Sequence, residues 1–487
     1  MKLSELTDRL GLGPPPVRDA EVTAVTADSR RVARGALFFA CKGERVDGHA
    51  FGVHAAAAGA VGIVGERASI NEWEGLPYFH ARDARQTLGI AAHLLAGNPT
   101  RSMTVIGVTG TNGKTSSVIL IRRILEHAGY RAGCFGTLGY DLGDATLPAP
   151  HTTPFAEDLA ALFHRAREKG VTHVAMEVSS HALDQERVAG IDFRAAVFTN
   201  LTQDHLDYHG DMERYRRAKL LLFERLDGPD RFAVVNTDDP SSGYFVDATR
   251  VPVITFGGKG DCQAEDVRVL RDRTVFRART PWGASEIEMR LIGKHNVANV
   301  LGAVAVCGGL GIAPATAAEG IASLASVAGR FERVEAGQPF HVIVDYAHTE
   351  DGLINVLEAA RSICENRLIV VFGCGGDRDK GKRPKMGQAA AERADFAIVT
   401  SDNPRTESPE RILLDIEVGV QRAGKRKNED YLIILDRGEA IRCALRMAKP
   451  GDLVLIAGKG HETYQIVGGE RIHFDDREVA RAVLEDL

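Results

Sequence analysis

Thr109-Gly110-Thr111-Asn112-Gly113-Lys114-Thr115 is the stretch that decides the fold of this chain. It follows an apolar run, residues 103–108, and precedes an apolar-periodic segment, which is the order strand, glycine turn and helix. A polyphosphate-binding loop requires this context, because backbone N–H groups of the turn and of the helix N-terminus then face the anion. Lys114 would reach the terminal phosphates, and the Thr115 hydroxyl would bind Mg²⁺. The stretch therefore predicts ATP or a related nucleotide as a ligand.

The loop departs from the usual phosphate-loop pattern at one position. That pattern has a glycine five residues before Gly113, where this chain has Val108, flanked by Gly107 and Gly110. The alternative is an ordinary glycine turn that joins a strand to a helix without binding a ligand. We favour phosphate binding, because the Gly-Lys-Thr sequence stands in the context that this function needs.

The length and composition of the chain limit the classes of protein to which it can belong. The 487 residues are enough for about three domains, and 44% hydrophobic and 26% charged residues are typical of a globular chain. The formal net charge of -6 weighs against nucleic acid as a partner. The seven scattered cysteines include no C-x-x-C pair, so neither a zinc site nor a disulfide framework is indicated. No signal peptide or membrane-spanning run is evident, so we expect a cytoplasmic protein that does not bind a membrane.

We expect three units along the chain. The first, residues 1–98, ends at Asn98-Pro99, because proline disfavours helix in the residue before it. The middle unit, residues 99–329, begins with the phosphate loop, and the last, residues 330–487, alternates strand and helix. The expected strands are residues 37–41, 61–64, 103–108, 174–176, 196–198, 232–235, 342–344, 368–371, 396–399, 432–435 and 453–456.

The last unit predicts a parallel sheet covered on both faces, because continuous apolar strands alternate with helices. Ligands of open parallel sheets bind outside the carboxyl ends of the strands. Polar, glycine-rich segments follow four of these strands, so we expect a second polar site at that edge; the alternative is a set of turns that bind nothing. The segments are residues 345–348, 373–378, 401–405 and 458–462.

Several motifs in register resemble the Mur ligases, the ATP-dependent amide-forming enzymes of bacterial cell-wall synthesis. Besides the phosphate loop they are residues 177–181, 200–205, 293–296 and 345–348, and together they span nearly the whole chain. Asp402-Asn403-Pro404-Arg405 narrows the resemblance to the branch that adds meso-2,6-diaminopimelate to UDP-N-acetylmuramoyl-L-alanyl-D-glutamate. The resemblance implies an α/β fold with the three-domain Mur ligase architecture: a UDP-substrate-binding N-terminal domain, a central P-loop ATP-binding domain and a C-terminal Rossmann-like parallel sheet that binds the incoming amino acid. We expect a monomer.

The resemblance also implies a mechanism. The γ-phosphate of ATP is transferred to the substrate carboxylate, and the diaminopimelate amine attacks the acyl phosphate. Activation is needed because a carboxylate is a poor electrophile, and catalysis is mainly positioning and charge stabilisation. Thr115 and Glu177 would hold one Mg²⁺, and His205 and Lys219 a second. Lys219 would be a carbamate (N6-carboxylysine) formed from CO₂, because an ammonium would repel the metal. The implied catalytic residues are Lys114, Glu177, His205 and Lys219.

Binding residues follow from the same resemblance. For ATP they are Gly110, Thr111, Asn112, Gly113, Lys114, Thr115 and Ser116 with Asn296, Arg330 and Asp345. For the UDP-substrate they are Ala27, Ser29, Glu44, Arg45, Val46, His151, Thr152, Thr153, Ser179, Gln185 and Arg187. His151 stands where a family member has asparagine, and residues 44–46 differ in type from the family, which favours backbone contacts.

The amino acid site is where the sequence selects the substrate. Diaminopimelate has a second carboxylate that lysine lacks, and the planar guanidinium of Arg405 can bind it with two hydrogen bonds. The alternative is a salt bridge of Arg405 within the last unit, for example with Glu407. The residues implied for diaminopimelate are Arg378, Asp402, Asn403, Pro404, Arg405, Gly458 and Glu462.

Three other functions stay open at this point. A Mur ligase that adds lysine or another amino acid would share the chemistry but would have no use for Arg405. A folylpolyglutamate synthetase would leave residues 1–98 without a purpose. A nucleotide-dependent regulatory protein that hydrolyses ATP to change shape would not require the second polar site.

Overall fold

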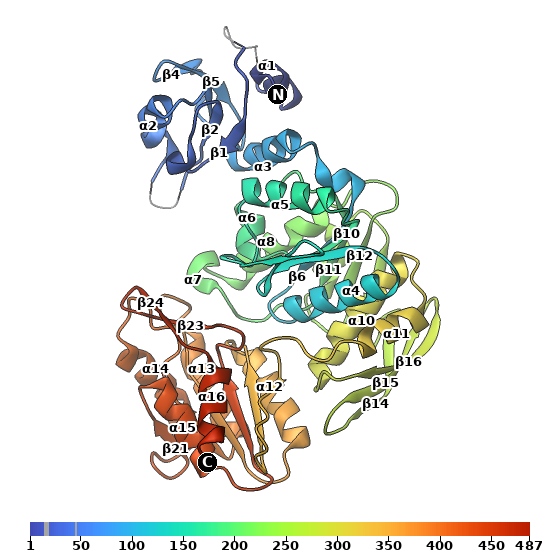
Figure 1. Ribbon diagram of the computed structural model, residues 1–487, viewed down its shortest axis with the longest axis vertical. Helices are drawn as coiled ribbons and strands as arrows, with labels where there is room; N and C mark the ends of the chain where they lie inside the picture. The colour runs from blue at the N-terminus through green and yellow to red at the C-terminus, as the bar shows by residue number, and fades with distance from the viewer. Residues whose placement is uncertain (14–18, 44–45) are drawn as a thin grey trace.

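The computed structural model of the protein describes residues 1–13, 19–43 and 46–487. Three units, each built around a main sheet, follow one another along the longest axis, with the N-terminal unit at the top of Figure 1 and the C-terminal unit at the bottom. Each strand expected from the sequence is present, with ends that differ by a few residues. The prediction of an α/β fold is therefore confirmed.

The N-terminal unit is a small sheet with strand order β1-β2-β3-β5-β4, in which only the β4–β5 pairing is antiparallel. Apolar side chains of β2, such as Phe38 and Phe39, are fully buried between its helices. The elements are α1 (Leu3–Arg9), β1 (Ala24–Thr26), a 3₁₀ turn (Ser29–Arg31), β2 (Ala36–Ala40), a 3₁₀ turn (Gly48–Phe51), α2 (Gly52–Ala57), β3 (Gly62–Gly65), β4 (Glu72–Trp73), β5 (Leu76–His80) and α3 (Ala84–Leu95).

The central unit places the phosphate loop at the middle of its main sheet, whose strand order is β13-β12-β11-β6-β10-β7-β8-β9. β13 to β7 run parallel, so the polar segments that follow β6, β10 and β11 meet at one edge. The elements around it are a 3₁₀ turn (Pro99–Ser102), β6 (Thr104–Thr109), α4 (Lys114–His127), β7 (Ala132–Gly136), β8 (Gly139–Asp141), β9 (Thr146–Leu147), α5 (Ala156–Glu168), β10 (His173–Glu177), α6 (Ser180–Asp184), β11 (Phe193–Phe198), α7 (Leu206–His209), α8 (Met212–Glu224), β12 (Phe232–Asn236), α9 (Ser242–Ala248) and β13 (Val253–Phe256).

An antiparallel sheet and two helices complete the central unit, and the sequence did not predict this sheet. Its order is β14-β15-β16, and its buried face packs against α10 and α11, as the shared core of Phe276, Ile287 and Val304 shows. The elements are β14 (Gln263–Val269), β15 (Thr274–Thr280), β16 (Gly283–Met289), α10 (Lys294–Gly309) and α11 (Pro314–Ala322).

The C-terminal unit has the predicted parallel sheet, in the order β17-β18-β22-β19-β20-β21, with β17 as an antiparallel edge strand. One face packs against α12, α13 and α14, and the other against α15 and α16. The elements are β17 (Glu332–Arg333), β18 (His341–Asp345), α12 (Glu350–Ile363), β19 (Leu368–Phe372), α13 (Lys382–Arg393), β20 (Phe396–Val399), α14 (Pro409–Arg422), β21 (Tyr431–Ile433), α15 (Arg437–Met447), β22 (Leu453–Ala457), β23 (Tyr464–Val467), β24 (Glu470–His473) and α16 (Asp476–Glu485).

Candidate active site

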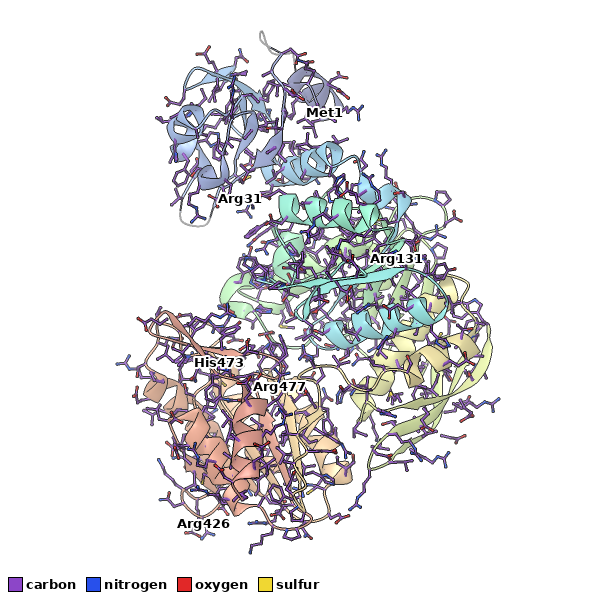
Figure 2. The ribbon with its side chains drawn as sticks, in the orientation of Figure 1. Met1, Arg31, Arg131, Arg426, His473 and Arg477 are labelled. Carbon is purple, nitrogen blue, oxygen red and sulfur yellow. The ribbon has the colours of Figure 1, made fainter. Side chains whose placement is uncertain are left out.

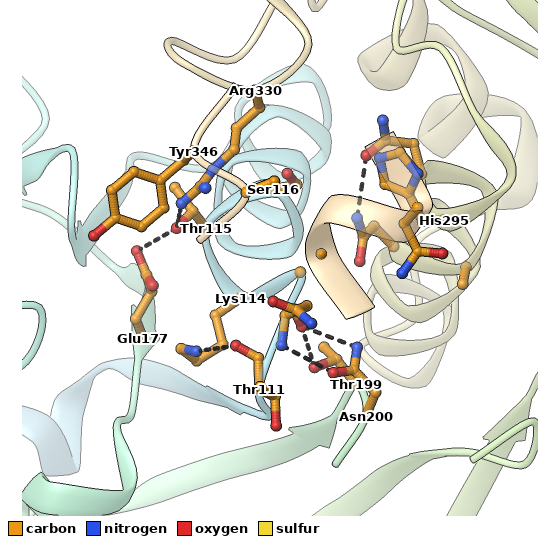
Figure 3. A pocket seen from close by; sticks show the side chains of 18 of the residues that line it. Thr111, Lys114, Thr115, Ser116, Glu177, Thr199, Asn200, His295, Arg330 and Tyr346 are labelled. Carbon is orange, nitrogen blue, oxygen red and sulfur yellow. Dashed lines mark hydrogen bonds between the residues drawn. The ribbon is translucent and has the colours of Figure 1, made fainter. Parts of the chain in front are cut away.

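A cavity of about 270 Å³ lies between the end of β6, the first turn of α4 and the C-terminal unit. Figure 3 shows its wall, in which Lys114, Thr115 and Ser116 of α4 face Glu177 of β10 and Arg330. Of the residues predicted to bind ATP, all except Gly110 line this cavity. The structure thus brings together segments that are far apart in the sequence.

The phosphate loop has the backbone that its glycines allow. Gly110 has φ +153°, and a Cβ there would collide with the Thr199 hydroxyl, so only glycine fits. Gly113 has φ +84° and precedes α4, whose first amides have no intrahelical acceptor. The backbone N–H of Thr111 donates to Asn200 O (2.8 Å), which fixes the loop against the segment after β11.

Two lysines, the buried Lys219 and the partly exposed Lys114, contact the same loop carbonyl. Lys114 Nζ donates to Gly110 O (2.9 Å) and Thr111 O (2.8 Å), and Lys219 Nζ donates to Gly110 O (2.8 Å). Burial, together with the neighbouring charge of Lys114, lowers the pKa of Lys219 well below its ordinary value. Lys219 lies behind the loop rather than in the cavity wall, and among the described residues it has no carboxylate partner. Burial favours the uncharged form of this amine, which is the form that reacts with CO₂, so the residue suits the carbamate that the resemblance implies.

Thr115 and Glu177 are in direct contact, as the resemblance implies. Thr115 Oγ1 donates to Glu177 Oε1 (3.0 Å), which also accepts from the Thr137 N–H (2.8 Å), and Arg330 Nη2 donates to Thr115 Oγ1 (3.0 Å; Figure 3). A hydroxyl and a carboxylate side by side suit a hard cation such as Mg²⁺. Within the described ranges no three His, Cys, Asp or Glu side chains converge on a metal position, so ATP phosphates or water would complete the shell.

His205 lines the same cavity, beside a buried carboxylate. Its Nε2 lies 3.2 Å from Asp204 Oδ2, and burial lowers the pKa of His205 to about 3. Lys382 Nζ, from the C-terminal unit, lies 3.4 Å from Asp204 Oδ1. Burial alone would raise the pKa of Asp204, but the charge of Lys382 holds this pKa well below its usual range. Asp204 therefore stays ionised at the junction of the two units.

The central residues predicted for the UDP-substrate form one connected group. Thr153 Oγ1 donates to Glu177 O (2.8 Å), Ser179 N–H donates to Thr153 Oγ1 (3.1 Å), and Arg187 Nη1 donates to Thr153 O (3.0 Å). Arg187 Nη2 also donates to Gln185 Oε1 (2.7 Å). The hydroxyl of Thr152 lies 3.2 Å from that of Thr137, which is next to Glu177, and the ring of His151 packs against Phe155.

The N-terminal residues predicted for the UDP-substrate stand apart from the cavity. Ala27 and Ser29 lie between β1 and β2, and Val46 is half exposed, whereas Glu44 and Arg45 lie outside the described residues. The unit is joined to α5 by Arg31, whose Nη2 lies 2.8 Å from Asp158 Oδ1 and which Figure 2 shows at the edge nearest the central unit.

The residues predicted for diaminopimelate lie past β20 and β22, except Arg378, which follows β19, and none of them lines the ATP cavity. Asn403 Nδ2 donates to Glu462 Oε2 (2.9 Å), and the fully buried Lys459 ammonium lies 2.9 Å from the same oxygen. Asp402 approaches Gly458 so closely that a Cβ there would lie 2.6 Å from Asp402 Oδ2. The structure thus brings the two segments together, and it adds Lys459, which sequence reasoning had not singled out.

Arg405 has no ion-pair partner among the described residues, and the alternative of a salt bridge with Glu407 is wrong. Glu407 Oε1 instead lies 2.8 Å from Arg383 Nη2. Arg405 Nη1 donates to Gly376 O (2.6 Å) beside Pro404, while burial and the charge of the nearby Arg378 lower the pKa of Arg405. A partly buried guanidinium next to a second cation can bind an anionic group such as a carboxylate.

Other residues of the cavity wall carried little sequence signal. Asn299 donates from Nδ2 to Asn296 Oδ1 (3.1 Å), and Asn296 Nδ2 donates to Ile292 O (2.9 Å). The spacing of Asn296 and Asn299, one turn apart on a helix, could have indicated this pair. Thr137 and Asn355 lie outside any motif, so only the fold brings them to the cavity.

The fold and the site define a multidomain α/β protein with a phosphate-loop nucleotide site and a second polar site at a sheet edge. Residues 108–307 match the model of the Mur ligase middle domain, residues 329–460 that of the Mur ligase glutamate ligase domain, and residues 21–92 that of the Mur ligase family catalytic domain. The chain belongs to the Mur ligase family.

Two relatives that match nearly the full length of the chain have the same name. The chain is 48% identical to the UDP-N-acetylmuramoyl-L-alanyl-D-glutamate--2,6-diaminopimelate ligase of Geobacillus thermodenitrificans (strain NG80-2), covering 100% of both chains. It is 45% identical to the protein of that name from Solibacter usitatus (strain Ellin6076), over 97% of this chain and 95% of the relative.

Solved structures agree on the fold. A structure of a UDP-N-acetylmuramoyl-L-alanyl-D-glutamate--2,6-diaminopimelate ligase superposes with a TM-score of 0.69 at 33% identity, over 100% of this chain and 99% of that chain. The folylpolyglutamate synthase of Mycobacterium tuberculosis, complexed with ADP and AMPPCP, has a TM-score of 0.64 at 20% identity, but it covers only 77% of this chain and 92% of its own. The second likeness concerns the fold alone.

Proposed function

We propose that this protein is an ATP-dependent ligase that adds meso-2,6-diaminopimelate to UDP-N-acetylmuramoyl-L-alanyl-D-glutamate in the cytoplasm, as a step of peptidoglycan precursor synthesis. The names of its full-length relatives support this reaction. The observation that carries the choice of amino acid is Arg405, a partly buried guanidinium without a carboxylate partner among the described residues, next to Asn403 and Glu462. We propose domains at residues 1–98, 99–329 and 330–487, and a monomer.

The ATP cavity supplies the groups that phosphoryl transfer needs. Lys114 and the first amides of α4 would hold the β- and γ-phosphates, and Arg330 would contact a phosphate from the opposite wall (Figure 3). Asn296 would contact adenine. Both carboxylate oxygens of Asp345 accept backbone N–H groups, which hold the side chain in place, and it would contact the ribose. Burial raises the pKa of Asp345.

Mg²⁺ would be held by Thr115 and Glu177 in one site and by His205 and carbamylated Lys219 in a second, and it would screen the phosphate charge during transfer. The contribution of the protein itself is to hold these side chains in position. Thr115 Oγ1 would supply a lone pair to the cation, and the guanidinium of Arg330, which donates to this oxygen, would be near enough to contact a phosphate of ATP. Lys219 is fixed behind the loop by Gly110 O, so its amine is held at the base of the site.

The reaction then proceeds by two substitutions. The substrate carboxylate attacks the γ-phosphorus, forming an acyl phosphate and releasing ADP. The neutral amine of diaminopimelate next attacks the acyl carbon, and the tetrahedral intermediate expels phosphate to leave an amide and a proton. Thr152, Thr153, Ser179 and Arg187, joined to Glu177, would hold the acceptor carboxylate at the open side of the ATP cavity.

The test measures ADP formation while one substrate at a time is omitted. The proposal predicts that ADP formation continues only when ATP, Mg²⁺, the UDP-muramoyl dipeptide and diaminopimelate are all present, and that the product has the mass of the tripeptide. When diaminopimelate alone is omitted, at most one ADP per enzyme should form, because the acyl phosphate is not consumed. A nucleotide switch would hydrolyse ATP without either co-substrate, and a lysine-adding enzyme would form its product with lysine. Either result would refute the proposal.

A further inference from the structure

Arg437 is a fully buried cation at the first position of α15, and no motif of the sequence points to it. Its Nε and Nη2 lie 2.7 Å from the two carboxylate oxygens of Asp476, at the first position of α16. A buried ion pair of this kind adds little net stability compared with apolar packing, because both charges lose their hydration. The remaining contacts of the guanidinium therefore decide what Arg437 does.

Those contacts reach the edge of the sheet where the amino acid site lies. Nη2 of Arg437 donates to Ala457 O (3.0 Å), and Nη1 makes a longer contact with Ser401 O (3.4 Å). Ala457 ends β22 and directly precedes Gly458, while Ser401 directly precedes Asp402. One side chain thus joins the two segments on which the proposed diaminopimelate contacts stand.

Side chains join these two segments across an intervening strand, and the contacts of Arg437 add to the hydrogen bond from Asn403 to Glu462. β20 and β22 are not neighbours, because β19 lies between them in the sheet. Their extensions nevertheless meet, since a Cβ on Gly458 would lie 2.6 Å from Asp402 Oδ2 and 3.9 Å from Arg437 Nη2. Burial alone would raise the pKa of Asp402, but the charges of Lys459 and Arg437 hold this pKa below its ordinary value. The carboxylate therefore stays ionised.

We propose that Arg437 is a positioning residue for the incoming amino acid: anchored by Asp476, it fixes the distance between Gly458 and Asp402 without touching the substrate. The inference rests on the proposed function, since it assigns the amino acid site to this edge. It predicts that changes at Arg437 weaken use of diaminopimelate while ATP binding, in a cavity that Arg437 does not line, is unaffected.

Two variants test this positioning. Arg437→Lys keeps the charge but cannot contact Asp476 and both carbonyls together. The double variant Arg437→Met with Asp476→Leu removes both buried charges, which is often neutral for stability. The matched control is Arg367→Lys: Arg367 also joins a buried carboxylate, Asp452 (2.6 Å), to a backbone carbonyl, but at the opposite edge of the sheet.

Steady-state kinetics with each substrate varied, and thermal melting, are measured for all four proteins. We expect the KM for diaminopimelate to rise about tenfold in both Arg437 variants, with the KM for ATP within about twofold and the control like wild type. An unchanged KM for diaminopimelate, a parallel rise for ATP, or unfolding of both variants would overturn the inference and leave Arg437 a purely structural residue. A wild-type protein that does not consume diaminopimelate would instead refute the proposed function.

Discussion

The side-chain amide of Asn112 in the phosphate loop donates a hydrogen bond to Asp351 Oδ2 of α12, 2.8 Å away and 239 residues further along the chain. Asn355 Nδ2 donates to the same oxygen (3.2 Å), and Thr349, which caps α12, contacts Asn112 Oδ1 (3.4 Å). The loop and the C-terminal unit therefore share one hydrogen-bonded network. Correct loop geometry depends on the docking of α12.

We predict that Asp351→Ala raises the KM for ATP about tenfold, because Asn112 loses its partner and the loop is less well ordered. The KM for diaminopimelate should change little. Both constants are measured from ADP formation. Glu358→Ala, at an exposed position of the same helix, is the control and should behave like wild type. An unchanged KM for ATP in the Asp351 variant would contradict the coupling.

Arg405→Ala should strongly weaken use of diaminopimelate while ATP binding is kept. Loss of a charge-assisted, two-point contact to a carboxylate costs about 2–3 kcal/mol, so the KM for diaminopimelate should rise about 30- to 160-fold. Arg405→Lys should recover part of the loss, because it restores charge without the planar fork. Calorimetry with ATP or ADP is the second measurement. A comparable loss of nucleotide affinity would contradict a role in amino acid binding.

Lys219→Met should fold and lose turnover. The buried amino group of Lys219 has no carboxylate partner among the described residues, so its removal should leave the melting temperature unchanged or raise it. Turnover should fall at least about a hundredfold, as expected when a group that stabilises phosphoryl transfer is lost. Melting and ADP formation are measured on the same preparation. A stable variant with near-normal turnover would rule out a catalytic role for Lys219.

His93 should make the protein less stable in mild acid. It lies on α3, is 1% exposed, and neither ring nitrogen has a partner among the described residues. Burial lowers its pKa to about 4, from about 6.5 in an unfolded chain. The unfolded state then binds the proton first, so stability is full above about pH 6.5 and falls, by up to about 3 kcal/mol, as the pH drops towards 4.

The variant His93→Leu isolates this contribution from that of the carboxylates. Its free energy of unfolding, measured by denaturant titration from pH 7 to 4, should depend less on pH than that of wild type. Identical slopes for the two proteins would contradict the assignment.

The sequence predicted the strands and the parallel sheets well, because apolar runs between helical segments report burial on both faces. The pairing of Thr115 with Glu177 was implied by the resemblance to the Mur ligases, and the two side chains are in contact. The antiparallel sheet from β14 to β16 was missed, since its burial alternates along half-exposed strands such as β15 and β16, and short alternating runs give a weak signal.

The sequence did not predict which residues of distant segments are in contact. Nothing local to Asn112 indicates Asp351, and nothing local to Arg437 indicates Asp476 or Ala457, because these pairings arise only when separate units or helices pack. Glu407 shows the converse: it is near Arg405 in sequence, yet its partner is Arg383, which α13 brings to it.

The most direct measurement offers the enzyme meso-diaminopimelate and lysine together, at equal concentration, with ATP, Mg²⁺ and the UDP-muramoyl dipeptide, and weighs the products. The guanidinium of Arg405 has no ion-pair partner among the described residues, and a site built around it predicts the diaminopimelate adduct almost alone, with one ADP formed for each adduct. A product mass that corresponds to lysine, or ADP without an adduct, would contradict it.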